Sequence, residues 1–97
     1  MDQPVKVIVK VIARPDAAAA MRDVVLTLAE CSRKEEGCVT YDVLQNTAEP
    51  HLFLLVEEWT SNAHLTAHNL TSHVHEAITK ATPLAAAPLD VGRYVTL

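Results

Sequence analysis

Apolar and polar positions alternate along the first part of the chain, and this alternation predicts a β-strand. Valines occupy every second position from Val5 to Val11, with lysine or isoleucine between them. Because successive side chains of a strand point to opposite faces, the pattern gathers the valines on one face. β-branched residues also dominate the stretch, as is typical of strands. We therefore expect a first strand over residues 5–13.

A helical spacing of apolar residues follows this strand. Asp16 comes directly after a proline and is the expected N-cap of a helix. Apolar side chains then recur three or four residues apart from Met21 to Cys31, which is the spacing of one helix face. Gly37 supplies the left-handed residue that commonly follows the end of a helix. These signals predict a helix over residues 17–36.

The remaining elements are predicted from strand-like and helix-like runs separated by turn residues. They are two antiparallel strands at 38–45 and 52–59, a short helix through Asn69 capped by Thr60 or Ser61, a second helix capped by Thr71 or Ser72 and ended by Pro83, and a last strand at 89–97.

This order of elements predicts a ferredoxin-like α+β fold with residues 1–97 in a single domain. Four mostly antiparallel strands would form one sheet, with the helices on one of its faces. The strand at 52–59 carries apolar side chains on both faces, whereas a sheet solvated on one side would show polar residues there. We therefore expect a homodimer in which the sheet of a second subunit covers the other face.

Composition and charge limit the partners of this domain. The 97 residues are 49% hydrophobic and 21% charged, which suits one domain with one core. A formal net charge of −4 without a basic cluster makes nucleic acid an unexpected partner. Lysines interrupt the first apolar run, so we expect no signal peptide, no membrane span and a cytoplasmic location. Cys31 and Cys38 are expected to be free thiols.

Histidines are concentrated in one part of the chain, close behind the only tryptophan, Trp59. Four of the five histidines lie within twelve residues: His64, His68, His73 and His75. His64 and His68 have the helical spacing of a metal-binding pair, but two ligands are too few for a stable site, so no metal is expected. We expect His64 and His75 to be exposed. His68 is either a hydrogen-bonded core residue or part of a site, and Trp59 and Tyr41 are either core or pocket wall.

Several short motifs in a fixed order carry a resemblance to a known family. They are Lys34-Glu35-Glu36-Gly37-Cys38 leading to Tyr41, then Glu57-x-Trp59, then Ala63-His64-Leu65-x-Ala67-His68, then Ser72-His73. With them the chain resembles the antibiotic biosynthesis monooxygenases over nearly its whole length, and within that family the bacterial quinol monooxygenases. The resemblance implies a dimeric α/β barrel with a pocket between helices and sheet in each subunit. It also implies oxygenation of phenols or quinols without a cofactor.

The residue chemistry is compatible with such a reaction. Only two glycines are present, so no glycine-rich cofactor loop can be built, and the electrons for an oxidation must come from the substrate. Triplet oxygen reacts slowly with closed-shell molecules unless the substrate is electron-rich, as a deprotonated phenol or quinol is. Neutral histidine, with a reference pKa of about 6.5, is suited to take that proton.

These considerations and the resemblance together assign roles to five residues. His68 is the favoured catalytic base, Trp59 and Tyr41 are expected in the substrate pocket wall, and His73 and Glu57 are expected to orient the substrate or relay a proton. The expected partners are a small aromatic or quinol-like substrate and oxygen, with no cofactor. Two alternatives remain open: a non-catalytic dimeric module that binds a small molecule, and an isomerase or decarboxylase that uses the same pocket without oxygen.

Overall fold

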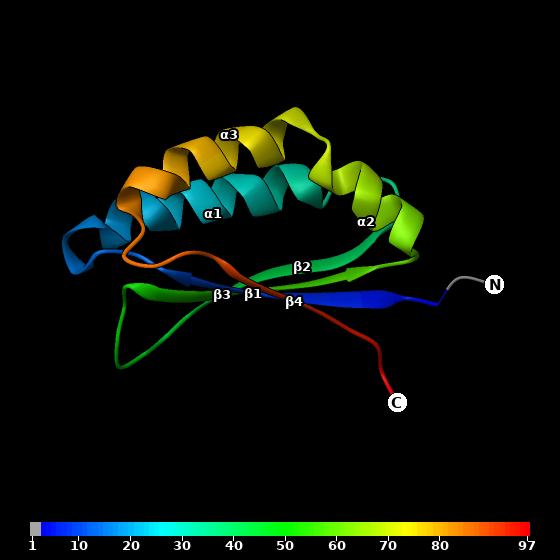
Figure 1. Cartoon of the computed structure of the whole chain (residues 1–97), viewed down its shortest axis with the longest axis horizontal. Helices are drawn as coiled ribbons and strands as arrows, with labels where there is room; N and C mark the ends of the chain where they lie inside the picture. Colours follow the sequence, from blue (N-terminus) through cyan, green and yellow to red (C-terminus); the bar gives the residue numbers. More distant parts are fainter. Residues whose placement is uncertain (1–2) are drawn as a thin grey trace.

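A computed structural model describes residues 3–97 as one antiparallel sheet with a layer of helices above it (Figure 1). Met1 and Asp2, which the single-domain prediction includes, lie outside the described residues. The elements in chain order are β1 (Val5–Ile12), a 3-10 turn (Pro15–Ala17), α1 (Ala18–Ser32), β2 (Cys38–Gln45), β3 (Leu52–Trp59), α2 (Asn62–Asn69), α3 (Ser72–Ala81), a second 3-10 turn (Thr82–Leu84) and β4 (Asp90–Tyr94).

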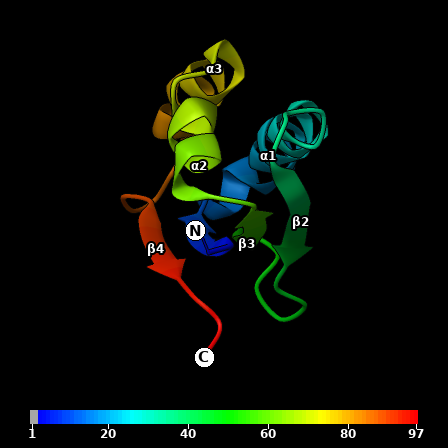
Figure 2. The ribbon, with the colours of Figure 1, turned by 90° about the vertical axis from the view of Figure 1, so that its right-hand side faces the viewer.

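The sheet has the strand order β2-β3-β1-β4, and every neighbouring pair is antiparallel. Figure 2, which looks along the helices, shows all of them on the same side of the sheet, and no helix within the described residues 3–97 lies on the opposite face. This arrangement confirms the predicted ferredoxin-like α+β fold with a four-stranded sheet and helices on one face.

The alternation seen in the sequence decides which side chains form the core. Val5, Val7, Val9 and Val11 of the central strand β1 are all buried beneath the helices. Phe53 of β3 is directly opposite Val11 in the sheet and is buried on the same face. Burying each side chain of this size stabilises the fold by about 1.5–3 kcal/mol.

The ends of α1 differ from the sequence prediction. Asp16 was expected to cap the helix, but it lies within the 3-10 turn, and α1 begins only at Ala18. No side chain among the described residues caps α1, and the Asp16 carboxylate instead lies 3.5 Å from Nε of Arg14. The helix also ends at Ser32, four residues before the predicted end at Glu36. Residues 33–37 form turns instead, and Gly37, the last of them, has a φ of 86°.

The other boundaries lie close to those predicted. Of the alternative caps, Ser61 accepts a hydrogen bond from the backbone of His64 and Thr71 accepts one from Val74. The last strand is shorter than the predicted 89–97, since only Asp90–Tyr94 pairs with β1.

Candidate active site

A group of polar side chains lies under α2, at the end of the sheet where β3 finishes. The alternation of β3 turns Glu57 and Trp59 toward the helices, and the strand register places Tyr41 of β2 directly opposite Glu57. His68 enters from α2, one turn after the buried Leu65. The strands β2 and β3 and the helix α2 thus bring together four of the residues predicted from the sequence: Tyr41, Glu57, Trp59 and His68.

His68 is at the centre of this group and is only 4% exposed. Its ring packs against the ring of Trp59, with centroids 4.5 Å apart and planes 35° apart, and lies 5.9 Å from the ring of Tyr41. Its Nδ1 lies 2.7 Å from Oε2 of Glu35, and its Nε2 lies 3.8 Å from Oε1 of Glu57. His68 is therefore a buried, hydrogen-bonded residue at the centre of this candidate site.

Glu57 is a buried acid in the same wall. Its Oε1 accepts a hydrogen bond of 2.9 Å from Nε1 of Trp59. Burial raises the pKa of the Glu57 carboxyl, and the Trp59 hydrogen bond and the neighbouring His68 only partly oppose that effect. Glu57 thus keeps its proton to a higher pH than an exposed glutamate does.

Tyr41 is also enclosed, and its hydroxyl is a weak acid in this environment. Burial first, and the charge of Glu57 second, raise the pKa of Tyr41 far above its ordinary value. Tyr41 therefore remains protonated at physiological pH and can donate a hydrogen bond to a substrate, but it cannot serve as the base.

Glu35 is the residue that the sequence reasoning missed. Its Oε2 lies 2.7 Å from Nδ1 of His68 and also 2.7 Å from Nε2 of His73 in the first turn of α3. The Glu35 side chain is 16% exposed and that of His73 is 23% exposed. Glu35 stood within the family-like motif before Gly37, but nothing in its local pattern indicated contacts to residues so far along the chain.

Among residues 3–97, Glu35, His68 and His73 are also the residues best placed to hold a metal ion. Their ligand atoms all lie within 4.8 Å of one another. Tetrahedral zinc, with bonds of about 2.0–2.1 Å, holds its ligand atoms roughly 3.3 Å apart. The two contacts of 2.7 Å are shorter than that and have the length of hydrogen bonds.

His64 has a different environment from the one expected. Instead of being exposed, it is half-buried, and its Nδ1 lies 2.9 Å from the Thr60 hydroxyl and 3.0 Å from the Ser61 hydroxyl. Its ring packs so closely on Gly37 that a Cβ at position 37 would collide with it. Although His64 and His68 are one helical turn apart, they therefore contact different groups, while His75 is exposed as predicted.

A cavity of about 160 Å³ lies between the helices and the sheet beside His68. Its polar lining residues are Tyr41, Glu57, His68, Asn69 and Arg93, and the others are aliphatic. Neither Trp59 nor His73 is among the described residues that line it. Trp59 lies behind the His68 ring, and His73 lines a separate cavity of about 220 Å³ beside α1 and α3.

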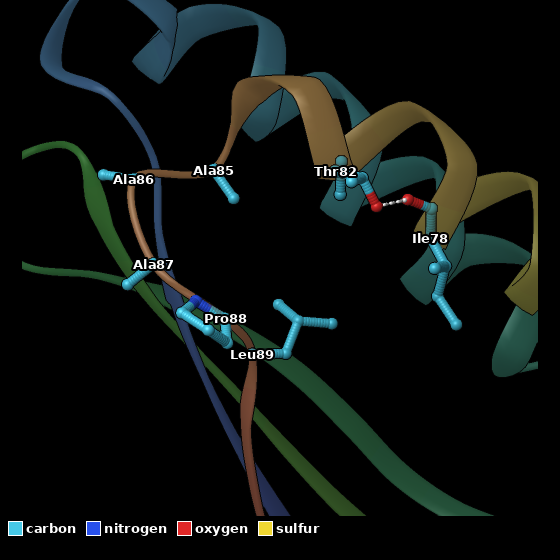
Figure 3. A pocket seen from close by; sticks show the side chains of 8 residues that line it. Ile78, Thr82, Ala85, Ala86, Ala87, Pro88 and Leu89 are labelled. Carbon is cyan, nitrogen blue, oxygen red and sulfur yellow. Dashed lines mark hydrogen bonds between the residues drawn. The ribbon is translucent and has the colours of Figure 1, made fainter.

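A second apolar cavity adjoins the first. It has a volume of about 330 Å³ and lies between the end of α3 and the alanine-rich segment that leads to β4 (Figure 3). Ile78 and Leu89 line both cavities. The two cavities are therefore neighbours, with Ile78 and Leu89 at their common boundary.

Comparison with known proteins shows which family this chain belongs to. A model of the family described as antibiotic biosynthesis monooxygenase matches residues 4–80. The chain belongs to this family. None of the helices in the described part of this family member is long and apolar enough to cross a membrane.

Two relatives are named putative monooxygenases, and their alignments cover much of this chain. "Putative monooxygenase YcnE" of Bacillus subtilis is 37% identical over 67 residues, which are 69% of this chain and 70% of that protein. "Putative monooxygenase Rv0793" of Mycobacterium tuberculosis is 33% identical over 93% of this chain and 96% of its own length.

Solved structures share the whole fold. The structure of Rv0793 superimposes with a TM-score of 0.92 over 98% of this chain and 96% of that chain, with 27% identity in the structural alignment. The crystal structure of PA3566 from Pseudomonas aeruginosa also gives a TM-score of 0.92, with 29% identity over 100% of this chain and 97% of that chain.

Proposed function

We propose that this member of the family is a cofactor-independent monooxygenase that oxidises a small phenol or quinol with molecular oxygen. The observation that carries the proposal is the position of His68, a buried histidine in the wall of a largely aliphatic cavity. Tyr41 and Glu57 share that wall. In this proposal His68 is the catalytic base, Tyr41 and Glu57 contact the substrate hydroxyl, Trp59 supports the His68 ring, and His73 helps to orient the base.

The dimensions of the cavity favour an aromatic ring. Its volume of about 160 Å³ is close to that of an engineered apolar cavity of about 150 Å³ that binds benzene. Aliphatic walls keep water away from reactive intermediates. A substituent on the ring would extend past Ile78 and Leu89 into the adjoining cavity.

The proposed reaction begins when Nε2 of His68 takes the proton of the substrate hydroxyl. The resulting phenolate gives one electron to oxygen, and the phenoxyl radical and superoxide combine at a ring carbon that bears a hydrogen, which forms a ring peroxide anion. His68 returns its proton to the outer peroxide oxygen, which gives a hydroperoxide. The C–H bond of the same carbon and the O–O bond then break together, so that the ring carbon becomes a carbonyl and the outer oxygen leaves as hydroxide, which takes up the released proton to form water. A phenol and O₂ thus yield a quinone and water, with all four electrons supplied by the substrate.

We also propose that the protein is a homodimer joined through the uncovered face of its sheet. Ile8, Leu44 and Leu54 are exposed on that face. A stable interface of this kind would bury on the order of 2,000 Å² in total. A cytoplasmic location is part of the proposal, since Cys31 and Cys38 are free thiols, as is usual in reducing compartments.

The deciding experiment is oxygen uptake by the purified protein with reduced quinones, polyphenols and anthrone-like compounds, with and without a chelator. We expect at least one of these compounds to consume one O₂ per molecule of quinone formed, without hydrogen peroxide. Binding without any reaction would favour the non-catalytic module. Product formation under nitrogen would favour the isomerase or decarboxylase.

A further inference from the structure

Glu35 forms the middle of a short hydrogen-bonded chain behind the candidate base. The chain runs from His73 on α3 through Glu35 to His68 on α2, and Glu35 itself is not among the described residues that line the His68 cavity. A mostly buried carboxylate is costly unless it is well paired, and two contacts of 2.7 Å supply that pairing. The arrangement therefore holds a negative charge against the side of His68 that is turned away from Glu57.

We propose that Glu35 is a positioning residue for His68, which fixes the tautomer of the imidazole and stabilises its protonated form during the reaction. This inference rests on the proposed function, in which His68 is the base. It adds Glu35 to the proposed mechanism as a residue that acts through His68 without contacting the substrate.

The tautomer follows from the hydrogen-bond chemistry. A carboxylate oxygen only accepts hydrogen bonds, so Nδ1 of His68 must carry the hydrogen that it donates to Glu35. A neutral imidazole has one N–H, so Nε2 then has a free lone pair. Nε2 is the nitrogen nearer to Glu57 of the cavity wall, at 3.8 Å from its Oε1. Glu35 thus leaves the basic nitrogen available on the side of the cavity.

The ring orientation is fixed from two sides. Trp59 packs on the plane of the imidazole, and a ring flip would replace Nδ1 with a carbon at the Glu35 contact. When Nε2 takes a proton, the ring becomes an imidazolium that is already in contact with a carboxylate. A buried cation without such a partner would be strongly disfavoured.

The backbone around Glu35 is arranged to hold it in place. Its N–H donates to the carbonyl of Ser32 at 3.0 Å, and its own carbonyl accepts from Cys38 at 3.2 Å. His73 donates the second hydrogen bond to the same carboxylate oxygen, so it keeps Glu35 directed at His68. His73 therefore acts on the base through Glu35.

The first test reads the tautomer directly by imidazole ¹⁵N NMR of the substrate-free protein near pH 8. We expect His68 to carry its hydrogen on Nδ1 in the unmodified protein and to lose this preference in the Glu35→Ala protein. A His68 with its hydrogen on Nε2 in the unmodified protein would overturn the inference. This measurement needs no substrate, so it remains informative if the proposed oxygenase activity is not found.

The second test compares steady-state kinetics of Glu35→Gln with Glu36→Gln, a matched change at the exposed neighbouring residue. We expect Glu35→Gln to lower kcat by roughly 10²- to 10⁴-fold with a small change in KM, by analogy with the loss of the orienting acid in a catalytic triad. Glu36→Gln should change neither. Full kcat in Glu35→Gln, or stoichiometric metal that Glu35→Gln abolishes, would refute the positioning role.

Discussion

Removing the imidazole of His68 is the most direct perturbation of the proposed chemistry. The ring offers Nε2 as the basic atom, because Nδ1 is already engaged with Glu35. We expect His68→Ala to lower kcat by roughly 10²- to 10⁴-fold, the usual contribution of a positioned acid–base group. At 1.36 kcal/mol per factor of ten, this equals about 2.7–5.4 kcal/mol of lost transition-state stabilisation. KM should change less, since the apolar walls that hold the ring remain.

The structure also sets the cost of this substitution for folding. His68→Ala removes the packing on Trp59 and one of the two hydrogen bonds to Glu35. A hydrogen bond to a charged group contributes about 1.5–3 kcal/mol, which is less than the 5–15 kcal/mol stability of a typical domain. The protein should therefore stay folded. His68→Gln provides a second variant that fills more of the space but cannot act as the base.

The assay is oxygen uptake at saturating substrate, with thermal melting to confirm that each variant is folded. His75→Ala is the matched control, because His75 is exposed on α3, whereas His64 is half-buried against Gly37 and would confound the comparison. A more acidic phenol should be less sensitive to the loss of His68, since it ionises with less help. Unchanged kcat in both folded His68 variants would show that His68 is not the base.

Four further outcomes are expected. Because burial raises the pKa of Glu57, the folded protein holds this proton more tightly than the unfolded chain does, so the contribution of Glu57 to stability falls as pH rises above about 4.3. The change in the free energy of unfolding caused by Glu57→Gln, measured in urea, should therefore favour the folded protein more at pH 7.5 than at pH 4.5. A change that does not depend on pH would contradict burial as the cause of the raised pKa. Leu54→Lys on the uncovered sheet face should convert the dimer to monomer in light scattering, and a monomeric unmodified protein at micromolar concentration would disprove the dimer. Gly37→Ala should destabilise the fold by about 1–3 kcal/mol or more, through its φ of 86° and the clash with His64, and an unchanged melting temperature would count against this packing. Elemental analysis of the purified protein should find no stoichiometric zinc, iron or copper, and activity that a chelator abolishes would refute the proposed mechanism.

Local periodicity was sufficient to predict the architecture. The alternating valines of β1 and the helical spacing of α1 each reflect the need to bury one face of an element, and burial is the dominant stabilising term in folding. The alternation of β3 predicted that Glu57 and Trp59 share one strand face. The concentration of histidines after Trp59 indicated a candidate site that includes His68. The boundaries of α1 were less predictable, because the 3-10 turn at its start removed Asp16 from the capping position.

The composition of the site depended on contacts between distant segments. Glu35 is 33 residues from His68 and 38 from His73 in sequence, and it meets both only because α1 stops at Ser32 and the following turns carry its side chain toward α2 and α3. His64, one turn from His68, packs on Gly37 for the same reason. Periodicity specifies which face of an element is buried, since that depends on neighbours along the chain. How the helices and the turn at residues 33–37 pack together decides which polar groups meet in the interior. No local pattern in the sequence encodes these contacts between residues that are far apart along the chain.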